Sequence, residues 1–360
     1  MKRKSLQLTL FLTNSCNLNC IYCYELKKNK GVMSYETAIK WIEYCLDNSE
    51  NEYVSIYLFG GEPLLQFPLV KRICEWTWSN VWNVKYSFTL QTNGTLLDEH
   101  MKEWFTTNKN LISLCLSLDG TRDTHNKNRC GSFDRIDLSF FKETWPKQPV
   151  KMTINYENIK NLKNDVVWIQ ENGFRIRGCN FAIGQSQFTD ETFKIIREQL
   201  RLLADYYIEH QYLEIAPILK LPLYLLSQKK EKRRLNCKIG TDELIVINTN
   251  GTRSPCTYFS NISFDTDEYK KLENEVWNLS HEKIQCYNQC DFFTICDMCY
   301  GENFSETGNF FIAPKNKCKL MKIRIAASMY LMSRWIIKKG NFTNEDILTL
   351  DVITKYYSKI

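Results

Sequence analysis

Three cysteines that could bind a metal centre lie within eight residues, at Cys16, Cys20 and Cys23. They follow an apolar segment, residues 6–12, that predicts a β-strand, so we expect them on the loop at its carboxyl end. Three thiolates at this spacing can bind three irons of one [4Fe–4S] cluster and leave the fourth iron open. Zinc is the alternative, but no Cys or His that could complete its tetrahedral shell lies between Cys23 and Cys45. The spacing therefore favours an iron–sulfur centre that also binds a ligand.

Further motifs follow this loop in order along the chain. Residues 58–63 read LFGGEP, residues 91–95 read QTNGT and residues 117–120 read SLDG; His125, Arg129 and residues 131–134 (GSFD) come next. The cysteine spacing is Cys-x3-Cys-x2-Cys, with Tyr22 before the third cysteine. Together these motifs resemble those of the radical S-adenosylmethionine (radical SAM) superfamily.

This resemblance implies a cofactor as well as a cluster. S-adenosylmethionine would chelate the open iron through its amino and carboxylate groups, and a low-potential electron would cleave it to methionine and a 5′-deoxyadenosyl radical. That radical abstracts hydrogen from a substrate carbon. The residues implied to bind the cofactor are Gly60, Gly61, Glu62, Pro63, Thr92, Asn93, Ser117, Asp119 and Arg129.

The residue types suit these roles, although some have simpler explanations. Gly60 and Gly61 lack a Cβ and allow close backbone approach. Ser117 and Asp119 can accept hydrogen bonds from a ribose, and the Arg129 guanidinium can bind a carboxylate through two parallel hydrogen bonds. The alternative for Glu62 is an acidic residue at a helix N-terminus. The alternative for Asp119 is an ordinary turn with Gly120.

A second cysteine group lies between residues 237 and 318. An apolar run at residues 244–247 followed by Asn250-Gly251 predicts a strand and a tight hairpin turn. The region resembles the SPASM domain, which carries auxiliary [4Fe–4S] clusters. The resemblance assigns Cys237, Cys256 and Cys299 to a first auxiliary cluster, and Cys286, Cys290, Cys296 and Cys318 to a second.

Two features of this group depart from the SPASM pattern. The later block reads Cys-x3-Cys-x5-Cys-x2-Cys, whereas the outer spacings are usually exchanged. The first auxiliary cluster has three cysteines, so it would have an open iron or a non-cysteine ligand, for which Asp242 and Glu243 are candidates. Taken alone, these seven cysteines could also form two zinc sites.

Composition limits the remaining possibilities. The chain has 360 residues, of which 44% are apolar and 24% charged, and a net charge of +6. This charge is too small to favour nucleic acid as a partner. No apolar run reaches 18 residues, so we expect no membrane span and a cytoplasmic location. Fifteen cysteines in that compartment are not a disulfide framework. The isolated ones, Cys45, Cys74, Cys115 and Cys179, are expected to be small core residues; the role of Cys130, next to Arg129, stays open.

The hydrophobic pattern predicts an α/β fold. Strands are predicted at residues 6–12, 53–59, 85–91, 112–118, 150–155 and 175–183, with helices at 35–46, 63–78, 97–107, 136–144, 162–171 and 190–209. Six such units favour a parallel sheet with its motifs at the carboxyl ends of the strands. The family resemblance implies a partial (β/α)6 barrel in residues 1–215, a linker in 216–236 that holds the charge run 229–234, a SPASM domain in 237–320 and C-terminal helices in 321–360.

These features predict an enzyme that modifies a peptide or protein. The leading hypothesis is a maturase that installs a cross-link, with a thioether favoured, in a ribosomally made peptide while the auxiliary clusters accept an electron. The alternative is an anaerobic sulfatase-maturating enzyme that forms formylglycine; a non-catalytic iron–sulfur electron-transfer or zinc-binding protein is also considered. No catalytic base is identified. A flavodoxin or ferredoxin is expected as electron donor. Only fifteen residues precede Cys16, so a leader peptide could require a separate binding protein.

Overall fold

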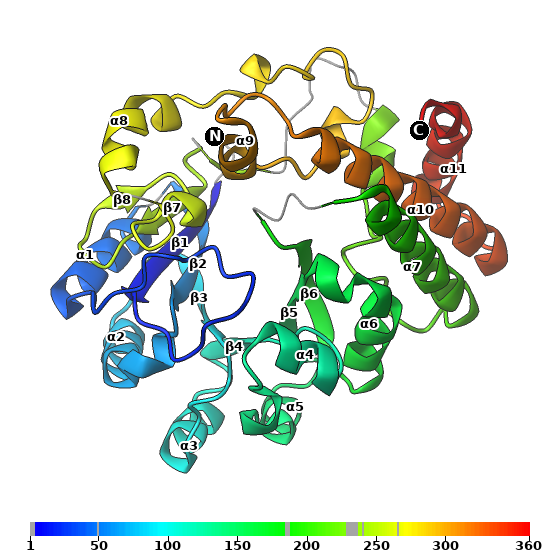
Figure 1. The fold of residues 1–360 in the computed structure, drawn as a ribbon. Helices are drawn as coiled ribbons and strands as arrows, with labels where there is room; N and C mark the ends of the chain where they lie inside the picture. The colour runs from blue at the N-terminus through cyan, green and yellow to red at the C-terminus, as the bar shows by residue number, and fades with distance from the viewer. Residues whose placement is uncertain (1–3, 49, 184–187, 228–236, 240, 265) are drawn as a thin grey trace. The chain divides into compact units, whose positions relative to one another are not determined.

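The computed structural model describes residues 4–48, 50–183, 188–227, 237–239, 241–264 and 266–360. The chain packs as two compact units (Figure 1). The first unit comprises residues 1–118, 125–150 and 238–279; the second comprises 119–124, 151–237 and 280–360. One division between the units, after residue 237, lies next to an expected domain boundary, whereas none lies at residues 215 or 320; the domain boundaries stay a prediction. The charge run at 229–234 lies outside the described residues.

The first unit is built on a mostly parallel sheet with strand order β4-β3-β2-β1-β7-β8. Its central pair has Leu8 opposite Ile56, and both side chains are fully buried. The predicted strands are confirmed, with small shifts at their ends. The bounds are β1 Lys4–Thr13, β2 Asn51–Gly60, β3 Lys85–Thr92, β4 Ile112–Ser117, β7 Leu244–Ile247 and β8 Arg253–Ser254.

β7 extends this sheet from a segment far along the chain. It pairs in parallel with β1, with Leu8 opposite Ile245, and it buries Val246 and Ile247. The following β8 is antiparallel to β7, and Gly251 between them has a φ of +82°. The predicted hairpin is therefore confirmed. Its attachment to the first strand of the sheet was not predicted, because the pairing partner of a short apolar run depends on tertiary structure.

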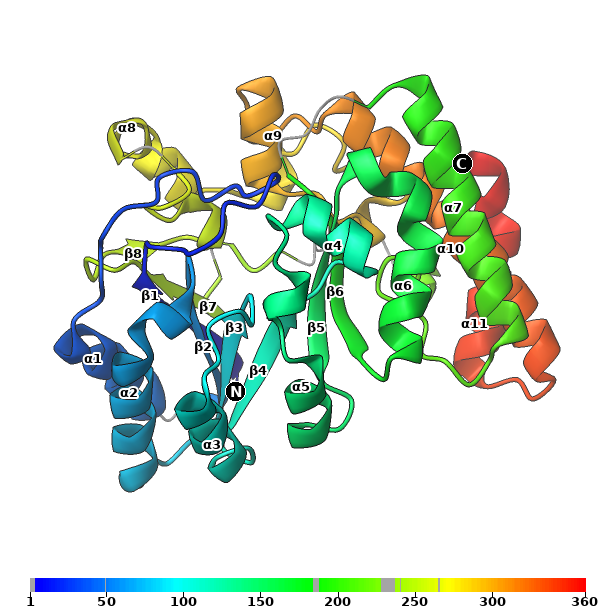
Figure 2. The ribbon, with the colours of Figure 1, turned by 60° about the horizontal axis from the view of Figure 1, so that its bottom comes forward.

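Helices flank the strands of the first unit. Figures 1 and 2 show α1, α2 and α3 running alongside β1 to β4. Their N-termini begin where the sequence offers caps, since Ser34 accepts a hydrogen bond from the Thr37 amide and Asp98 from the Met101 amide. The bounds are α1 Tyr35–Leu46, α2 Phe67–Ser79, α3 Glu99–Thr107, α5 Leu138–Thr144 and α8 Thr266–Trp277; α4, Arg122–Asn128, ends just before Arg129.

The second unit contains most of β5 and all of β6, with helices that pack on one another. α7 packs against α6 and α10, and α10 packs against α11 (Figure 2). The bounds are β5 Pro149–Ile154, β6 Arg175–Phe181, α6 Leu162–Glu171, α7 Asp190–Glu209, α9 Tyr300–Thr307, α10 Lys315–Lys339 and α11 Asn344–Tyr356. The C-terminal helices expected in residues 321–360 correspond to α10 and α11, although α10 begins earlier, at Lys315.

The core of the second unit lies beside its cysteines. Phe292, Met329 and Tyr356 belong to one buried apolar cluster, against which Cys290 and Cys296 pack. Within the described part of the chain, none of the helices is both long and apolar enough to cross a membrane.

Candidate functional site

The loop after β1, residues 14–24, carries the first three cysteines and is called the cluster loop. Cys16, Cys20 and Cys23 are all half-buried on it. A turn joins the last two, since the Cys23 amide donates to the Cys20 carbonyl over 3.1 Å. The Cys16 sulfur accepts a hydrogen bond from the Leu18 amide over 3.4 Å. Burial raises the pKa of the Cys16 thiol, and the nearby Cys23 adds to this. The loop therefore gathers thiols that a bound metal centre would have to deprotonate.

Two cations lie beside these thiols. The Lys28 ammonium donates to the Leu18 carbonyl over 2.9 Å, and the Arg129 guanidinium lies 5.4 Å from the centre of the Tyr22 ring. Burial raises the pKa of Cys23, and Lys28 and Arg129 act against that rise. Cations of this kind favour thiolates and the negative charge of a thiolate-bound cluster. Lys28 was not predicted, because nothing in its sequence position distinguishes it from other surface lysines.

Gly60 and Gly61 pack directly on the cluster loop. The Gly61 amide donates to the Thr13 carbonyl over 3.0 Å, and the Glu62 amide donates to the Ser15 carbonyl over 2.9 Å. A Cβ on Gly61 would lie 2.3 Å from the Ser15 carbonyl oxygen, and Gly60 has a φ of +133°. Gly60 therefore approaches the end of β1 closely, and Gly61 approaches the cluster loop. Their contact with a cofactor stays a prediction.

The Glu62 side chain is buried and ties two strand ends together. One carboxylate oxygen accepts hydrogen bonds from the Leu64 amide (3.1 Å) and the Thr92 hydroxyl (2.8 Å). The other accepts from the Asn93 amide over 2.8 Å. Burial raises the pKa of Glu62 to about 7 despite these donors. Glu62 caps the short 3-10 helix Pro63–Gln66, so the helix-terminal alternative is confirmed.

The loop after β3 contacts the cluster loop through Asn17. The Asn93 side-chain amide donates to the Asn17 side-chain oxygen over 2.9 Å. The Asn17 amide in turn donates to the Thr95 hydroxyl over 2.8 Å. Asn17 lies inside the cysteine motif, between the first two cysteines, but its role in joining the loops could not be read from that position. Thr92 and Asn93 are therefore part of the same assembly as Cys16.

The segment that follows α4 also reaches the cluster loop. The Ile21 amide donates to the Asn128 carbonyl over 3.1 Å, and the Cys130 thiol donates to the Asn19 carbonyl over 2.9 Å. Cys130 is exposed and has a φ of +54°, unlike the other isolated cysteines, which are buried as expected. These two contacts hold Arg129 between them beside the cluster loop.

Ser117 and Asp119 are placed in different units. Ser117 accepts a hydrogen bond from the Gln91 side chain over 2.8 Å, in the first unit. Asp119 is fully buried in the second unit, where it accepts from the Thr153 amide over 3.0 Å. The predicted ribose contacts of both residues stay predictions.

Asp165, a residue that was not predicted, organises the turn after Asp119. Its carboxylate accepts hydrogen bonds from the Thr121 amide (3.0 Å) and hydroxyl (2.9 Å). A Cβ on Gly120, whose φ is +126°, would lie 2.3 Å from the Asp165 side chain. The glycine of the SLDG motif is therefore required by packing as well as by its turn conformation.

Four cysteines of the second unit surround one cavity of about 70 Å³. Cys290 is close enough to Cys286, Cys296 and Cys318 to raise the pKa of each, in addition to the larger effect of burial. In residues that the structure describes, no three His, Cys, Asp or Glu side chains converge closely enough to hold a single ion. The lining residues are Cys286, Cys290, Phe292, Phe293, Cys296, Met298, Ala313, Lys317, Cys318, Met321, Lys322 and Ile325.

This arrangement fits a cluster of several irons. Four thiols that line one space are the ligand set of a [4Fe–4S] cluster. Although the cysteine spacing in residues 286–299 differs from the SPASM pattern, Cys286, Cys290 and Cys296 line one cavity together with Cys318. That they bind a [4Fe–4S] cluster stays a proposal.

Two of the other three cysteines are neighbours in the second unit. Cys299 precedes α9 as its N-cap. Burial raises the pKa of Cys299 to about 11; the amides of Glu302 and Gly301 oppose this rise, and Cys237 adds to it. Cys256 belongs to the first unit, so the predicted trio stays a prediction.

The surroundings of Cys256 lie in the first unit. Burial raises the pKa of the Tyr24 hydroxyl, and both Cys256 and Cys23 add to that rise. Of the two proposed non-cysteine ligands, Glu243 forms an ion pair with Lys238 at 3.5 Å. The ligand role of Asp242 and Glu243 stays a prediction.

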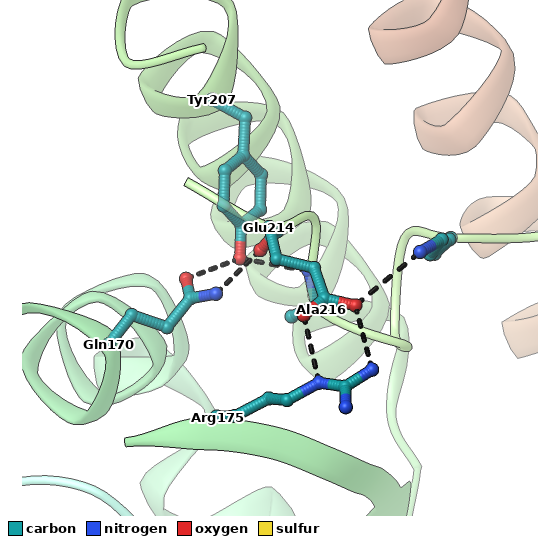
Figure 3. A network of polar contacts seen from close by, with 6 residues as sticks. Gln170, Arg175, Tyr207, Glu214 and Ala216 are labelled. Carbon is teal, nitrogen blue, oxygen red and sulfur yellow. Dashed lines mark hydrogen bonds and ion pairs between the residues drawn. The ribbon is translucent and has the colours of Figure 1, made fainter. Parts of the chain in front are cut away.

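A larger cavity of about 510 Å³ also lies in the second unit, within the size range of ligand sites. Figure 3 shows a network of polar contacts around Tyr207 and Glu214 in the same unit. The Tyr207 hydroxyl donates to the Gln170 side chain over 2.7 Å and accepts from the Ala216 amide over 3.0 Å. Glu214 accepts from Arg175 over 2.9 Å and pairs with Lys220, a lining residue, at 3.5 Å. Sequence patterns gave no sign of this cavity, because its walls come from distant segments.

Comparison with known proteins identifies similar sequences and folds. The family model of the radical SAM superfamily matches residues 10–137. The chain is 31% identical over 330 residues to a cysteine-type anaerobic sulfatase-maturating enzyme of Clostridium novyi, covering 79% of this chain and 84% of that protein. It is 23% identical over 368 residues to the radical SAM cyclopropyl synthase TigE of Paramaledivibacter caminithermalis, covering 94% and 75%. The fold matches native anSMEcpe with bound AdoMet and Cp18Cys peptide, with a TM-score of 0.68, 19% identity, and coverage of 93% and 99%.

Proposed function

The chain belongs to the radical SAM superfamily, and from this premise we propose that it is an enzyme that uses S-adenosylmethionine to oxidise a side chain of a peptide or protein. One observation carries the proposal. Three segments distant in sequence, residues 60–63, 91–95 and 128–130, all hydrogen-bond to or pack on the loop that holds Cys16, Cys20 and Cys23. An assembly of this kind positions one shared site at the carboxyl ends of parallel strands.

The residues present fit the cofactor that the family implies. A [4Fe–4S] cluster on Cys16, Cys20 and Cys23 would bind S-adenosylmethionine at its open iron and supply the electron that releases methionine and a 5′-deoxyadenosyl radical. Lys28 and Arg129 offset the negative charge of the thiolates. Glu62 holds the strand ends of β2 and β3 in register, and Gly60 and Gly61 keep this edge close to the cluster loop.

We further propose that the product is a cross-linked peptide, with a thioether favoured, and that the auxiliary clusters accept the remaining electron. The cavity bounded by Cys286, Cys290, Cys296 and Cys318 supports a cluster beyond the first site. A structure of similar fold contains both AdoMet and a peptide. The cyclopropyl synthase relative supports a reaction that forms a new bond. A flavodoxin or ferredoxin would supply electrons, and a separate protein could present a leader peptide.

Formylglycine formation is the second candidate, favoured by the identity to the Clostridium novyi enzyme. The two products are separable by mass spectrometry after incubation with a cysteine-containing sulfatase peptide and with a Cys-rich precursor peptide. A cross-link removes two hydrogens and retains the sulfur, whereas conversion of cysteine to formylglycine removes the sulfur. Formylglycine on the sulfatase peptide alone would replace the cross-linking proposal with this candidate.

The initiating step can be tested without knowing the substrate. Protein reconstituted anaerobically with iron and sulfide is expected to release 5′-deoxyadenosine from S-adenosylmethionine when dithionite is added. A variant with Cys16, Cys20 and Cys23 all replaced by Ala is expected to lose this product and to retain the iron of the auxiliary groups. Wild-type protein that binds iron but yields no 5′-deoxyadenosine would contradict the enzyme proposal and favour an electron-transfer protein.

A further inference from the structure

In the second unit, a nearly buried ion pair connects the surroundings of the four-cysteine cavity with those of Cys299. The Lys317 ammonium lies 2.9 Å from a Glu302 carboxylate oxygen, and the two side chains are 14% and 10% exposed. Lys317 lines the cavity of Cys286, Cys290, Cys296 and Cys318. Glu302 lies in the first turn of α9, directly after Cys299. Lys317 therefore lies next to the four-cysteine group, and Glu302 lies close to Cys299.

The two charges act on different thiols. Lys317 directly precedes Cys318 on α10 and lines the same cavity as Cys296 and Cys318. Glu302 lies in the first turn of α9, whose N-cap is Cys299. The positive end of the pair therefore faces the four-cysteine group, and the negative end faces the group that contains Cys299 and Cys237.

Neighbouring charges hold the pair in place. Asp297 lies 3.7 Å from the Lys317 ammonium and also pairs with Arg324. Burial alone would lower the pKa of Lys317, but Asp297 and Glu302 raise it above its ordinary value. Asp297 directly follows Cys296 in the chain, so its negative charge opposes that of Lys317 at this group. Removing Lys317 would therefore leave Asp297, which also pairs with Arg324, beside the four-cysteine group without the charge of this lysine.

We propose that the Lys317–Glu302 pair sets the order of the reduction potentials of the two auxiliary groups, raising that of the four-cysteine group and lowering that of the group containing Cys299. The proposal rests on the auxiliary clusters of the proposed function. Added positive charge near a cluster stabilises its reduced state, and negative charge destabilises it, because reduction adds one negative charge. Solvent screens charges in a nearly buried pair less than charges at the surface. Lys317 and Glu302 are positioning residues in this scheme.

The test is a redox titration followed by electron paramagnetic resonance. It uses protein in which Cys16, Cys20 and Cys23 are replaced by Ala, so that only auxiliary signals remain. Cys290→Ala and Cys299→Ala assign the two signals. Lys317→Met is expected to lower the midpoint potential of the four-cysteine group, and Glu302→Gln to raise that of the other group. Both changes narrow the gap between the potentials.

Matched variants separate charge from structure. Lys317→Arg keeps the charge and is expected to leave the potentials near those of wild type. Lys315→Met removes an exposed lysine two residues earlier on α10 and is expected to have little effect. If Lys317→Met does not assemble its clusters, the double variant Lys317→Met/Glu302→Gln is used, since removing both charges avoids a buried unpaired one.

Three results would overturn the proposal: unchanged potentials in both single variants, an equal shift in Lys315→Met, or a shift of the wrong group by Glu302→Gln. Iron and sulfide analysis of the same preparations distinguishes this failure from failure of the proposed function. If the variant lacking Cys16, Cys20 and Cys23 retains no clusters, the auxiliary clusters themselves are absent.

Discussion

At the scale of single residues, the first site depends on two glycines, which have no side chain, as well as on the side chain of Glu62. Gly60 and Gly61 leave room for the Thr13 and Ser15 carbonyls, and this contact sets where the cluster loop lies relative to β2. Glu62 then uses both carboxylate oxygens on neighbouring backbone and side-chain donors. The GGEP sequence therefore has a structural reason for every residue before any cofactor is considered, with Pro63 beginning the short helix that Glu62 caps.

Gly61→Ala is expected to displace the cluster loop, because the new Cβ would lie 2.3 Å from the Ser15 oxygen and 3.1 Å from the Cys16 Cβ. A displacement of about 1 Å would reduce 5′-deoxyadenosine formation by roughly 10²-fold. The measurement is the rate of that product in reconstituted protein. Gly178→Ala is the control, since its nearest neighbour would be 3.6 Å away. Equal rates in Gly61→Ala and wild type would show that the contact does not position the loop.

The buried carboxyl of Asp165 makes the free energy of unfolding of the protein depend on pH. Burial raises its pKa to about 6, above the usual value of about 3.9, although Thr121 and Thr124 oppose this. The native state therefore holds the proton more tightly, and this contribution to stability is present below pH 4 and lost as pH rises to 6. The loss is on the order of 2–3 kcal/mol. Urea denaturation of wild type and Asp165→Asn between pH 4 and 6 should show that the free energy of unfolding falls less with rising pH in the variant. An equal fall in both proteins would contradict this role of Asp165.

At the scale of elements, α10 connects the second core to the auxiliary cysteines. Its first turns carry Lys317 and Cys318, and its middle contributes Met321, Ile325 and Met329 to the core cluster. Cys290 and Cys296 pack against the same cluster. The four-cysteine cavity is thus built on the edge of a packed core, which can hold the thiols apart before any metal binds.

Met329→Ala is expected to lower the free energy of unfolding by about 2–5 kcal/mol, because Met329 is fully buried and its removal leaves a cavity. Ile337→Ala, on the same helix but 61% exposed, should change it by about 0.5 kcal/mol or less. Urea denaturation of the two variants provides the comparison. A similar decrease in the free energy of unfolding for both variants would mean that the helix propensity of α10, and not its packing in the core, controls stability.

At the scale of the whole molecule, the protein combines a site for starting radical chemistry with cysteine groups that the starting step does not need. The cluster loop and the segments that contact it lie within the first unit, and the four-cysteine cavity lies within the second. Loss of one should therefore leave the other able to form. This separation allows each to be tested in the intact chain.

Replacing Cys286 and Cys296 with Ala is expected to remove about one third of the iron, one [4Fe–4S] cluster of three, while 5′-deoxyadenosine formation from S-adenosylmethionine persists. Peptide product should fall to background. Iron analysis and chromatography of both products measure the effect. Cys45→Ala, at a fully buried cysteine of α1, is the control for loss of a thiol. Complete loss of 5′-deoxyadenosine formation in the double variant would show that the two sites are not independent.

Local patterns in the sequence determined the strands, the helices and the cysteine loop, whereas the grouping of Cys286, Cys290, Cys296 and Cys318 came from the resemblance to the SPASM domain. The local patterns depend on periodicity and short spacing, which are properties of neighbouring residues. Hydrogen bonds that join distant segments could not be predicted in this way. Asn17 with Asn93 and Asp165 with Thr121 are examples, since either partner alone is an ordinary polar residue.

Cys16, Cys20 and Cys23 could therefore be recognised from the sequence alone, because their spacing is itself the signal. Only the tertiary structure decided what surrounds them: Lys28 and Arg129 beside the thiols, and the strand ends held by Glu62. The same holds for the later cysteines, where folding brings Lys317 to Glu302 across fifteen residues of sequence. Charge acts through distance in space, and sequence spacing does not reveal that distance.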